Sequence, residues 1–250
     1  MESIFETITT MIKGVFFDLG GTLYTYRNIP NVTAPLLSTA IEKADLAAPK
    51  GEIKKAFLDA TSLAIQEYSS KSYYLHESFF LSVFDFFMKQ LGGITDNELR
   101  TWYVKNHRES IINALEPKAD CVSLLKALNE AGIYTSIVSN IDQDMLEPLI
   151  ARDKLNAYLN HWTSSETVRS CKPDEKIFRH AIKISKLREE EILFVGDSPE
   201  HDIAGASHMG LATVLITDGG MPPPLQSGRQ EVRPDFTIKN LDEIKKILSL

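Results

Sequence analysis

Several short stretches of this sequence carry side chains whose chemistry could act together. Asp18 follows the apolar run 15–17, and Asp197 follows the apolar run 192–195. A carboxylate such as Asp18 can attack phosphorus and form an aspartyl-phosphate, which divides a difficult displacement into two easier steps. Asp197 and Asp202 offer carboxylate oxygens, the ligands that Mg²⁺ prefers in proteins. The pattern predicts a carboxylate nucleophile beside a magnesium site.

Other residues, most of them also located shortly after apolar runs, could hold a phosphate. Gly21 and Thr22 follow Asp18 and would let the backbone turn while exposing N–H groups and a hydroxyl to an anion. Ser139 and Asn140 follow a third apolar run and offer the same kinds of donor. Lys172 stands directly before a proline, and its ammonium could neutralise a phosphate and a nucleophilic carboxylate.

Each of these stretches also has a purely structural interpretation. Asp18 alone could stabilise a turn at the end of a strand, and Asn140 or Asp142 could cap the next helix. Lys172 could be a solvated lysine on a loop, and Asp197 could belong to a turn before a capped helix. The occurrence of the whole set in one chain favours the chemical interpretation.

The elements around these residues predict how they come together. From residue 118 onward, short apolar runs alternate with amphipathic stretches, which favours a parallel, doubly wound sheet. The expected strands are at 15–17, 133–138, 192–195, 211–216 and 236–238. Helices are expected from 121 to 128, from Pro173 at the first helical position, and from 240 to 250. The carboxyl ends of parallel strands would bring the chemical residues to one edge.

Residues 24–116 have a different pattern, in which helical periodicity dominates and strand patterns are nearly absent. Helices are expected at 53–68, 75–91 and 95–115, with a stop at Gly92-Gly93 and a new start at 95–98. The prediction is an α/β protein: a Rossmann-like parallel sheet core of residues 1–23 and 117–250 with an all-helical cap domain of residues 24–116. A proline-containing surface loop is expected from 221 to 234.

Composition narrows the class of partner. The 250 residues are 43% hydrophobic, and the net charge of −7 disfavours nucleic acid and anionic membranes as main partners. Only two cysteines occur, without a CxxC pair, which predicts a reducing compartment and no zinc site. Residues 1–12 lack a basic-then-apolar leader, and no apolar run reaches membrane-spanning length. We expect a cytoplasmic protein, either a monomer or a homodimer.

Four motifs of the haloacid dehalogenase-like (HAD) hydrolases resemble stretches of this chain, in the same order. The stretches are Asp18-Leu19-Gly20-Gly21-Thr22, Ser139-Asn140, Lys172-Pro173-Asp174 and Gly196-Asp197 through Asp202. They span the whole expected core, with room for a cap between the first and second motifs. The resemblance implies a Mg²⁺-dependent phosphatase of small phosphorylated metabolites that acts through an aspartyl-phosphate.

The resemblance also implies roles for individual residues. Asp18 would be the nucleophile, while Ser139 and Lys172 would hold the phosphoryl group. Gly21, Thr22 and Asn140 would complete the phosphate cradle. Mg²⁺ would bind Asp18, the carbonyl of Gly20 and Asp197, with Asp202 as a supporting ligand.

Gly20 is where the chain departs from the family pattern, which has a second aspartate there as general acid/base. The backbone carbonyl remains available to a metal, but the proton carrier is missing. Losing a positioned general acid/base typically costs roughly 10²–10⁴-fold in rate. In the phosphatase hypothesis, a good leaving group or a cap residue makes up for it. The cap candidates are Lys71, Tyr73, His76 and His107.

Two alternatives remain open beside the phosphatase. The first is a relative with different chemistry, either phosphonate cleavage or dehalogenation. Phosphonate-cleaving relatives carry alanine at this position and use a cap lysine, for which Lys54 and Lys55 are available. Dehalogenating relatives carry an aromatic residue and need no metal, which the pair Asp197 and Asp202 argues against. The other alternative is a weakly active phosphate-binding or regulatory protein, which the retention of the four motif side chains disfavours.

Overall fold

The structure is a computed structural model that describes residues 11–217 and 232–250. It divides into two compact units, Met1–Tyr26 with Glu116–Leu250, and Arg27–Leu115. The sequence prediction put the boundaries at 23/24 and 116/117. Residues 221–231 of the expected proline-containing loop lie outside the described residues, as do residues 1–10.

The first unit is built on a six-stranded sheet with the order β5-β4-β1-β6-β7-β8. All neighbouring strands are parallel. The strands are β1 (Gly14–Phe17), β4 (Tyr134–Ser139), β5 (His161–Ser164), β6 (Ile192–Gly196), β7 (Ala212–Ile216) and β8 (Phe236–Ile238). The predicted α/β class with a Rossmann-like parallel sheet is therefore confirmed.

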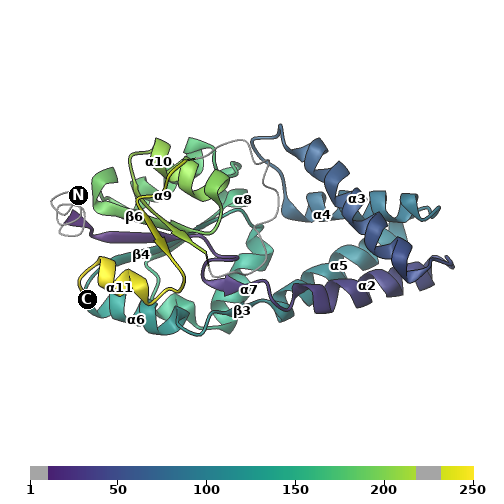
Figure 1. The fold of residues 1–250 in the computed structure, drawn as a ribbon, viewed down its shortest axis with the longest axis horizontal. Helices are drawn as coiled ribbons and strands as arrows, with labels where there is room; N and C mark the ends of the chain where they lie inside the picture. Colours follow the sequence, from purple (N-terminus) through teal and green to yellow (C-terminus); the bar gives the residue numbers. More distant parts are fainter. Residues whose placement is uncertain (1–10, 218–231) are drawn as a thin grey trace. The chain divides into compact units, whose positions relative to one another are not determined.

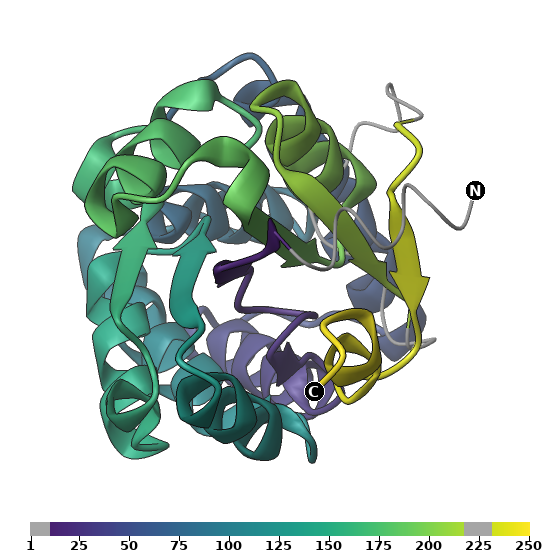
Figure 2. The same cartoon turned by 90° about the vertical axis from the view of Figure 1, so that its left-hand side faces the viewer.

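Helices cover both faces of this sheet. They are α6 (Cys121–Glu130), α7 (Gln143–Arg152), α8 (Ser165–Val168), α9 (Glu175–Ser185), α10 (Gly205–His208) and α11 (Glu243–Ile247), with a π-helical turn η3 at Pro199–Ala204. Helices α9 and α10 lie on one face, and α6 and α11 lie on the other (Figures 1 and 2). This layering buries both faces of the sheet and leaves its carboxyl edge for polar residues.

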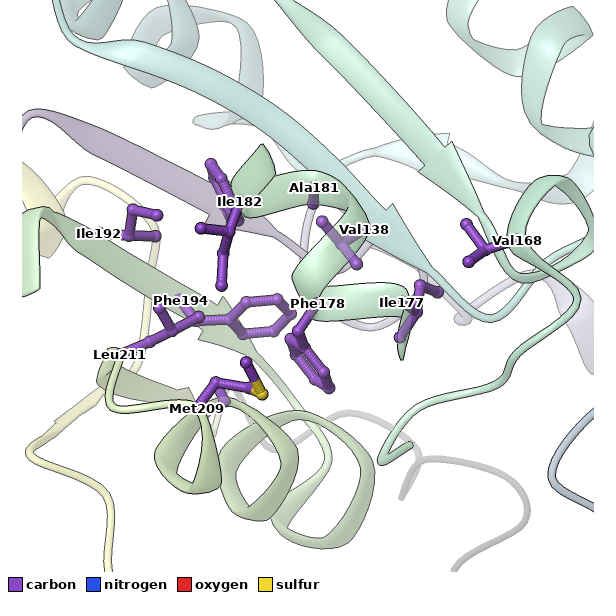
Figure 3. Packing of buried hydrophobic residues seen from close by; sticks show 12 residues of the cluster. Val138, Val168, Ile177, Phe178, Ala181, Ile182, Ile192, Phe194, Met209 and Leu211 are labelled. Carbon is purple, nitrogen blue, oxygen red and sulfur yellow. The ribbon is translucent and has the colours of Figure 1, made fainter. Parts of the chain in front are cut away.

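A cluster of apolar side chains fixes helix α9 against the sheet (Figure 3). Ile177, Phe178 and Ala181 share one face of the helix and are fully or almost fully buried. The Phe178 ring meets Phe194 of β6 edge to face, with 5.3 Å between the ring centroids. Burying a side chain of this size contributes about 1.5–3 kcal/mol. The cluster therefore anchors the segment that carries Lys172.

Some local predictions were wrong. Helix α9 begins at Glu175, because the side chain of Asp174 accepts the N–H of Lys176 and caps the helix. Pro173 therefore lies before the helix rather than at its first position, after a cis peptide bond. The closing helix α11 is shorter than the predicted 240–250. Strand β5 was not predicted.

Within the described residues of the second unit, all regular secondary structure is helical. The helices are α2 (Ile29–Lys43), α3 (Lys50–Tyr68), α4 (His76–Gln90) and α5 (Asn97–Ala114). Asp96 caps α5 by accepting the N–H of Leu99, as the predicted new start requires. Phe84 and Tyr103 stack at 3.9 Å between ring centroids, so these aromatic residues form core. Helix α2, which has a proline in its first turn, was not among the predicted helices.

Two very short strands flank the point where the chain leaves and re-enters the first unit. Strand β2 (Tyr24–Thr25) pairs antiparallel with β3 (Glu116–Pro117). The N–H of Lys118 donates to the carbonyl of Leu23 at 2.8 Å and extends this pairing. Residues 25 and 116 are thus direct neighbours. Across the described residues, we find no helix long and apolar enough to cross a membrane.

Candidate active site

Asp18 stands at the carboxyl end of β1, one of the two central strands of the sheet. Its N–H donates to the carbonyl of Val195 at 2.9 Å, which continues the pairing between β1 and β6. Ser139 ends the neighbouring strand β4, and Asp197 directly follows β6 on the other side. The predicted meeting of these residues at one sheet edge is what the topology produces.

Lys172 lies at the centre of a buried charge cluster. Its Nζ is 2.6 Å from Asp18 Oδ1 and 2.6 Å from Asp202 Oδ1. The hydroxyl of Ser139 donates to the same Asp18 oxygen at 2.9 Å. The N–H of Ser198 donates to the second oxygen of Asp202 at 3.0 Å. Lys172 is 3% exposed, so these carboxylates replace the water that its ammonium would otherwise bind.

The electrostatics of the cluster follow from burial and from its excess of negative charge. Burial alone would lower the pKa of Lys172, but Asp18 and Asp202 raise it, so the amine stays charged. Burial, together with repulsion from Asp18, raises the pKa of Asp197 and of Asp202 above the usual range. Lys172 and the more distant Lys118 do not balance three carboxylates, because the pKa of Asp197 stays raised in spite of both ammonium groups, so the site favours a further cation.

The donor set fits Mg²⁺. Oxygens of Asp18, Asp197 and Asp202 all lie within 4.8 Å of one another. The only donors in this set are oxygens, which suits a hard divalent cation. A Cβ on residue 21 would overlap the carboxylate of Asp197, with 2.5 Å to its Cγ, and the φ of Gly21 is +77°. Glycine is required there because the backbone and this carboxylate approach so closely.

The residues predicted to cradle phosphate have distinct surroundings. Thr22 is fully buried, and its hydroxyl has no hydrogen-bond partner within the described residues. Asn140 donates to the carbonyl of Lys172 at 3.0 Å and accepts the N–H of Lys172 at 2.6 Å. Its side chain thus positions the backbone of Lys172, while the phosphate contact stays a prediction. Gly21 accepts a hydrogen bond through its carbonyl from Lys118 Nζ at 2.6 Å.

Two residues close to the site were missed from the sequence. Lys118 holds the turn after Asp18 through its contact with Gly21. The ring of Tyr26 lies against Gly20 and Gly21, since a Cβ built on Gly20 would be 2.8 Å from its Cζ. Both residues lie next to the expected domain boundaries, where no spacing pattern connects them to Asp18.

The cap residues considered as proton carriers or amines lie in the second unit. His107 is 7% exposed and packs between Tyr103 and Phe80, so it is part of that unit's core. The ammonium of Lys71 lies over the ring of Tyr68 and donates a hydrogen bond to the carboxylate of Glu67. Lys54 and Lys55 are exposed on α3. Tyr73 and His76 precede and begin α4.

Comparison with known proteins identifies the family. The model of haloacid dehalogenase-like hydrolases matches residues 12–210, most of the chain. The chain belongs to this family. This HAD-like hydrolase is 26% identical over 239 residues to the glyceraldehyde 3-phosphate phosphatase of Methanopyrus kandleri. The match covers 95% of this chain and 97% of that protein.

Other relatives of this HAD-like hydrolase have different names. It is 29% identical over 131 residues to (S)-2-haloacid dehalogenase 4A of Burkholderia cepacia, covering 50% of this chain and 56% of that protein. The fold resembles that of the HAD-hydrolase YfnB from Bacillus subtilis with a TM-score of 0.74 at 17% identity. That match covers 96% of this chain and 99% of the other. The family establishes a hydrolase, and its relatives include both phosphatases and dehalogenases.

Proposed function

We propose that this HAD-like hydrolase is a Mg²⁺-dependent phosphatase of small phosphorylated metabolites that acts through a phospho-Asp18 intermediate. The observation that carries the proposal is the cluster of Asp18, Asp197 and Asp202 around the buried ammonium of Lys172. A carboxylate nucleophile beside an oxygen-rich cation site and a fixed positive charge suits phosphoryl transfer. The phosphatase names among its relatives support the same class of substrate.

The roles of the residues follow from their contacts. Asp18 Oδ attacks phosphorus, and the ammonium of Lys172 offsets the negative charge that nucleophile and phosphate bring together. Ser139 holds the nucleophile's oxygen, and Asn140 fixes the backbone of Lys172. Asp18, the Gly20 carbonyl and Asp197 would hold Mg²⁺, with Asp202 in support. When bound, the ion supplies charge neutralisation at the phosphoryl oxygens.

Dehalogenation is the second candidate, because haloacid dehalogenases are among the relatives and residue 20 lacks a carboxylate. In that reaction Asp18 would attack a carbon that carries a halogen. The third carboxylate of the cluster disfavours it, because a haloacid is an anion and a reaction that needs no metal leaves the surplus negative charge without a cation to offset it. Phosphonate cleavage has the further requirement of an amine, for which Lys54 and Lys55 remain the proposed source.

The test is hydrolysis of para-nitrophenyl phosphate with Mg²⁺ and with a chelator, in the wild type and in Asp18→Asn. We expect the chelator to stop turnover and Asp18→Asn to lower kcat by about 10³-fold or more, because the nucleophile is lost. Intact-mass measurement after rapid quenching should find one phosphoryl group on the wild type and none on the variant.

The matched control is Asp242→Asn, the same change at an exposed residue that directly precedes α11 and whose carboxylate pairs with Lys245 of that helix. It should leave turnover unchanged. Turnover that survives Asp18→Asn would refute the nucleophile. Halide release from a 2-haloacid in a parallel screen, without phosphate release from any ester, would favour the dehalogenase instead. Cleavage of phosphonoacetaldehyde alone would favour the phosphonatase.

A further inference from the structure

The space above Gly20 is occupied by another residue. A Cβ built on Gly20 would overlap the hydroxyl of Tyr26 and would lie 2.8 and 2.9 Å from Cζ and Cε1 of its ring. Real Cβ atoms essentially never approach other atoms within 3.0 Å. A Cβ on Gly21 would lie 3.1 Å from Cε2 of the same ring. The phenol therefore fills the volume in which a side chain at residue 20 would begin.

The chemistry of that volume favours a neutral donor. The side chain is a phenol, which keeps its proton at neutral pH. Its ring lies against both Gly20 and Gly21, and the Cβ position of Gly21 is also next to the carboxylate of Asp197, so the phenol stands beside the carboxylate cluster. A neutral phenol donates one hydrogen bond, and ionisation is not needed for this role.

We propose that the hydroxyl of Tyr26 takes the place of the side chain that residue 20 lacks and donates a hydrogen bond to the leaving-group oxygen of the phosphate ester. This rests on the proposed phosphatase function. It makes Tyr26 a catalytic residue of the first chemical step, contributed by a position eight residues after the nucleophile. The ring of Tyr26 can then occupy this position because Gly20 has no side chain.

The chemical step balances without a proton transfer from the protein. Asp18 Oδ forms a bond to phosphorus, and the bond from phosphorus to the leaving oxygen breaks with its electron pair on that oxygen. Tyr26 keeps its proton and stabilises the new anion by a hydrogen bond. The anion takes its proton from water after departure.

This arrangement determines the class of substrate. A donor that keeps its proton offsets only part of the charge on the departing oxygen, so leaving groups that are already stable as anions can depart and simple alkoxides depart far more slowly. Acyl, enol and aryl phosphates have such leaving groups, and simple alkyl phosphates do not. We therefore assign to this site phosphorylated metabolites with a weakly basic leaving group.

A series of aryl phosphates with increasingly basic leaving groups tests the hydrogen bond. For the wild type, kcat should fall steeply along the series. Tyr26→Phe should lower kcat by about tenfold to a hundredfold for the most basic leaving groups and by much less for a dinitrophenolate, which carries little charge on its oxygen. An equal loss along the whole series, or no loss, would overturn the role of Tyr26.

Tyr24→Phe is the matched control. Tyr24 lies two residues earlier and is fully buried, and its hydroxyl bonds Asp153 at 2.7 Å rather than the carboxylate cluster. The change should lower the melting temperature and leave the dependence on the leaving group as in the wild type. If Tyr24→Phe also changed how kcat depends on the basicity of the leaving group, general destabilisation rather than the Tyr26 hydroxyl would explain that dependence.

A stability measurement separates this inference from the phosphatase proposal, because it needs no turnover. Gly20→Ala should destabilise the wild type but have little effect in a Tyr26→Ala background, where the ring no longer fills the space. Equal destabilisation in both backgrounds would show that the Tyr26 ring does not occupy the space of a side chain at residue 20. If Gly20→Ala destabilises only the protein that keeps Tyr26, but no phosphate is hydrolysed and Asp18 is never labelled, the phosphatase and the hydrogen bond are refuted. The packing of Tyr26 over Gly20 would still stand.

Discussion

At the scale of single residues, the site is a cluster with more negative than positive charge. Lys172 contacts Asp18 and Asp202 at 2.6 Å each, but Asp197 adds a third carboxylate. Burying a charge without full compensation is costly, and the raised pKa values of Asp197 and Asp202 report that cost. The same imbalance that destabilises the metal-free protein prepares it to bind a divalent cation.

Asp197→Asn should therefore have opposite effects on stability without and with Mg²⁺. A carboxyl group whose pKa is raised by folding binds protons that the unfolded chain has released, so the unfolding free energy falls as pH rises above about 4. At pH 8 without Mg²⁺, the variant should be more stable than the wild type by about 1 kcal/mol or more. Urea unfolding measures this difference.

Added Mg²⁺ should reverse the order. Saturating Mg²⁺ at one hundred times its Kd stabilises a binding-competent protein by about 2.7 kcal/mol, and the variant should lose most of that gain. Asp242→Asn, which removes one exposed carboxylate, should behave like the wild type in both conditions. A variant that is less stable than the wild type without metal would contradict the charge imbalance.

At the scale of elements, the sequence predicted the strands and helices whose periodicity is strong. The continuous apolar runs of β1, β6 and β7 are typical of parallel strands buried on both faces, and so they were predicted. Strand β5 carries His161, Thr163 and Ser164, so it lacks the apolar run that would mark it. Helix α2 contains Pro35 in its interior, which argues against a helix in any pattern-based prediction.

The site was predictable where a residue follows a predicted strand, and not where it reaches the site from elsewhere. Asp18, Ser139 and Asp197 stand at strand ends, so the topology alone brings them together. Tyr26 was missed because its ring turns back over Gly20, and only three-dimensional packing reveals this. Lys118 was missed because its contact is with a backbone carbonyl 97 residues away in sequence.

Helix α5 carries a buried titratable residue, His107, which packs against Phe80 of α4. Burial lowers the pKa of His107 from 6.5 to about 4. Below pH 6.5 the unfolded chain takes up a proton that the folded one refuses, so the unfolding free energy decreases as pH falls toward 4. The whole decrease amounts to about 3 kcal/mol. Denaturant unfolding between pH 4 and 7 should show it.

His107→Phe should flatten this dependence, because phenylalanine keeps a ring between Tyr103 and Phe80 and carries no titratable group. Tyr103→Phe is the control: it changes the same cluster but removes a hydroxyl that does not titrate in this range. That control should shift stability evenly across the pH range. An unchanged slope in His107→Phe would mean that other groups cause the acid sensitivity.

At the scale of the whole molecule, the chain consists of two units with separate cores. The second unit is one continuous segment, Arg27–Leu115, inserted between β2 and β3 of the first. Because Thr25 and Glu116 are paired across those strands, their Cα atoms are about 4.5–5.5 Å apart. A gap of this size can be closed by a short hairpin loop.

A shortened protein should therefore fold without residues 27–115. We expect that joining Tyr26 to Glu116 through Gly-Asn-Gly gives a core that unfolds cooperatively and keeps the stabilisation by Mg²⁺, since Asp18, Lys172, Asp197 and Asp202 all belong to the first unit. It should also release phosphate from activated aryl phosphates. Circular dichroism, unfolding with and without Mg²⁺, and phosphate release measure these outcomes.

The same shortened protein distinguishes what each unit contributes to function. If substrate choice resides in residues 27–115, the core should lose discrimination between phosphorylated metabolites while Asp18 still becomes phosphorylated. Asp18→Asn in the shortened protein is the control for phosphorylation at that carboxylate. A folded core that binds Mg²⁺ but never acquires a phosphoryl group would place an essential group for the first step within residues 27–115, and Tyr26 with the four motifs would then be insufficient for the chemistry.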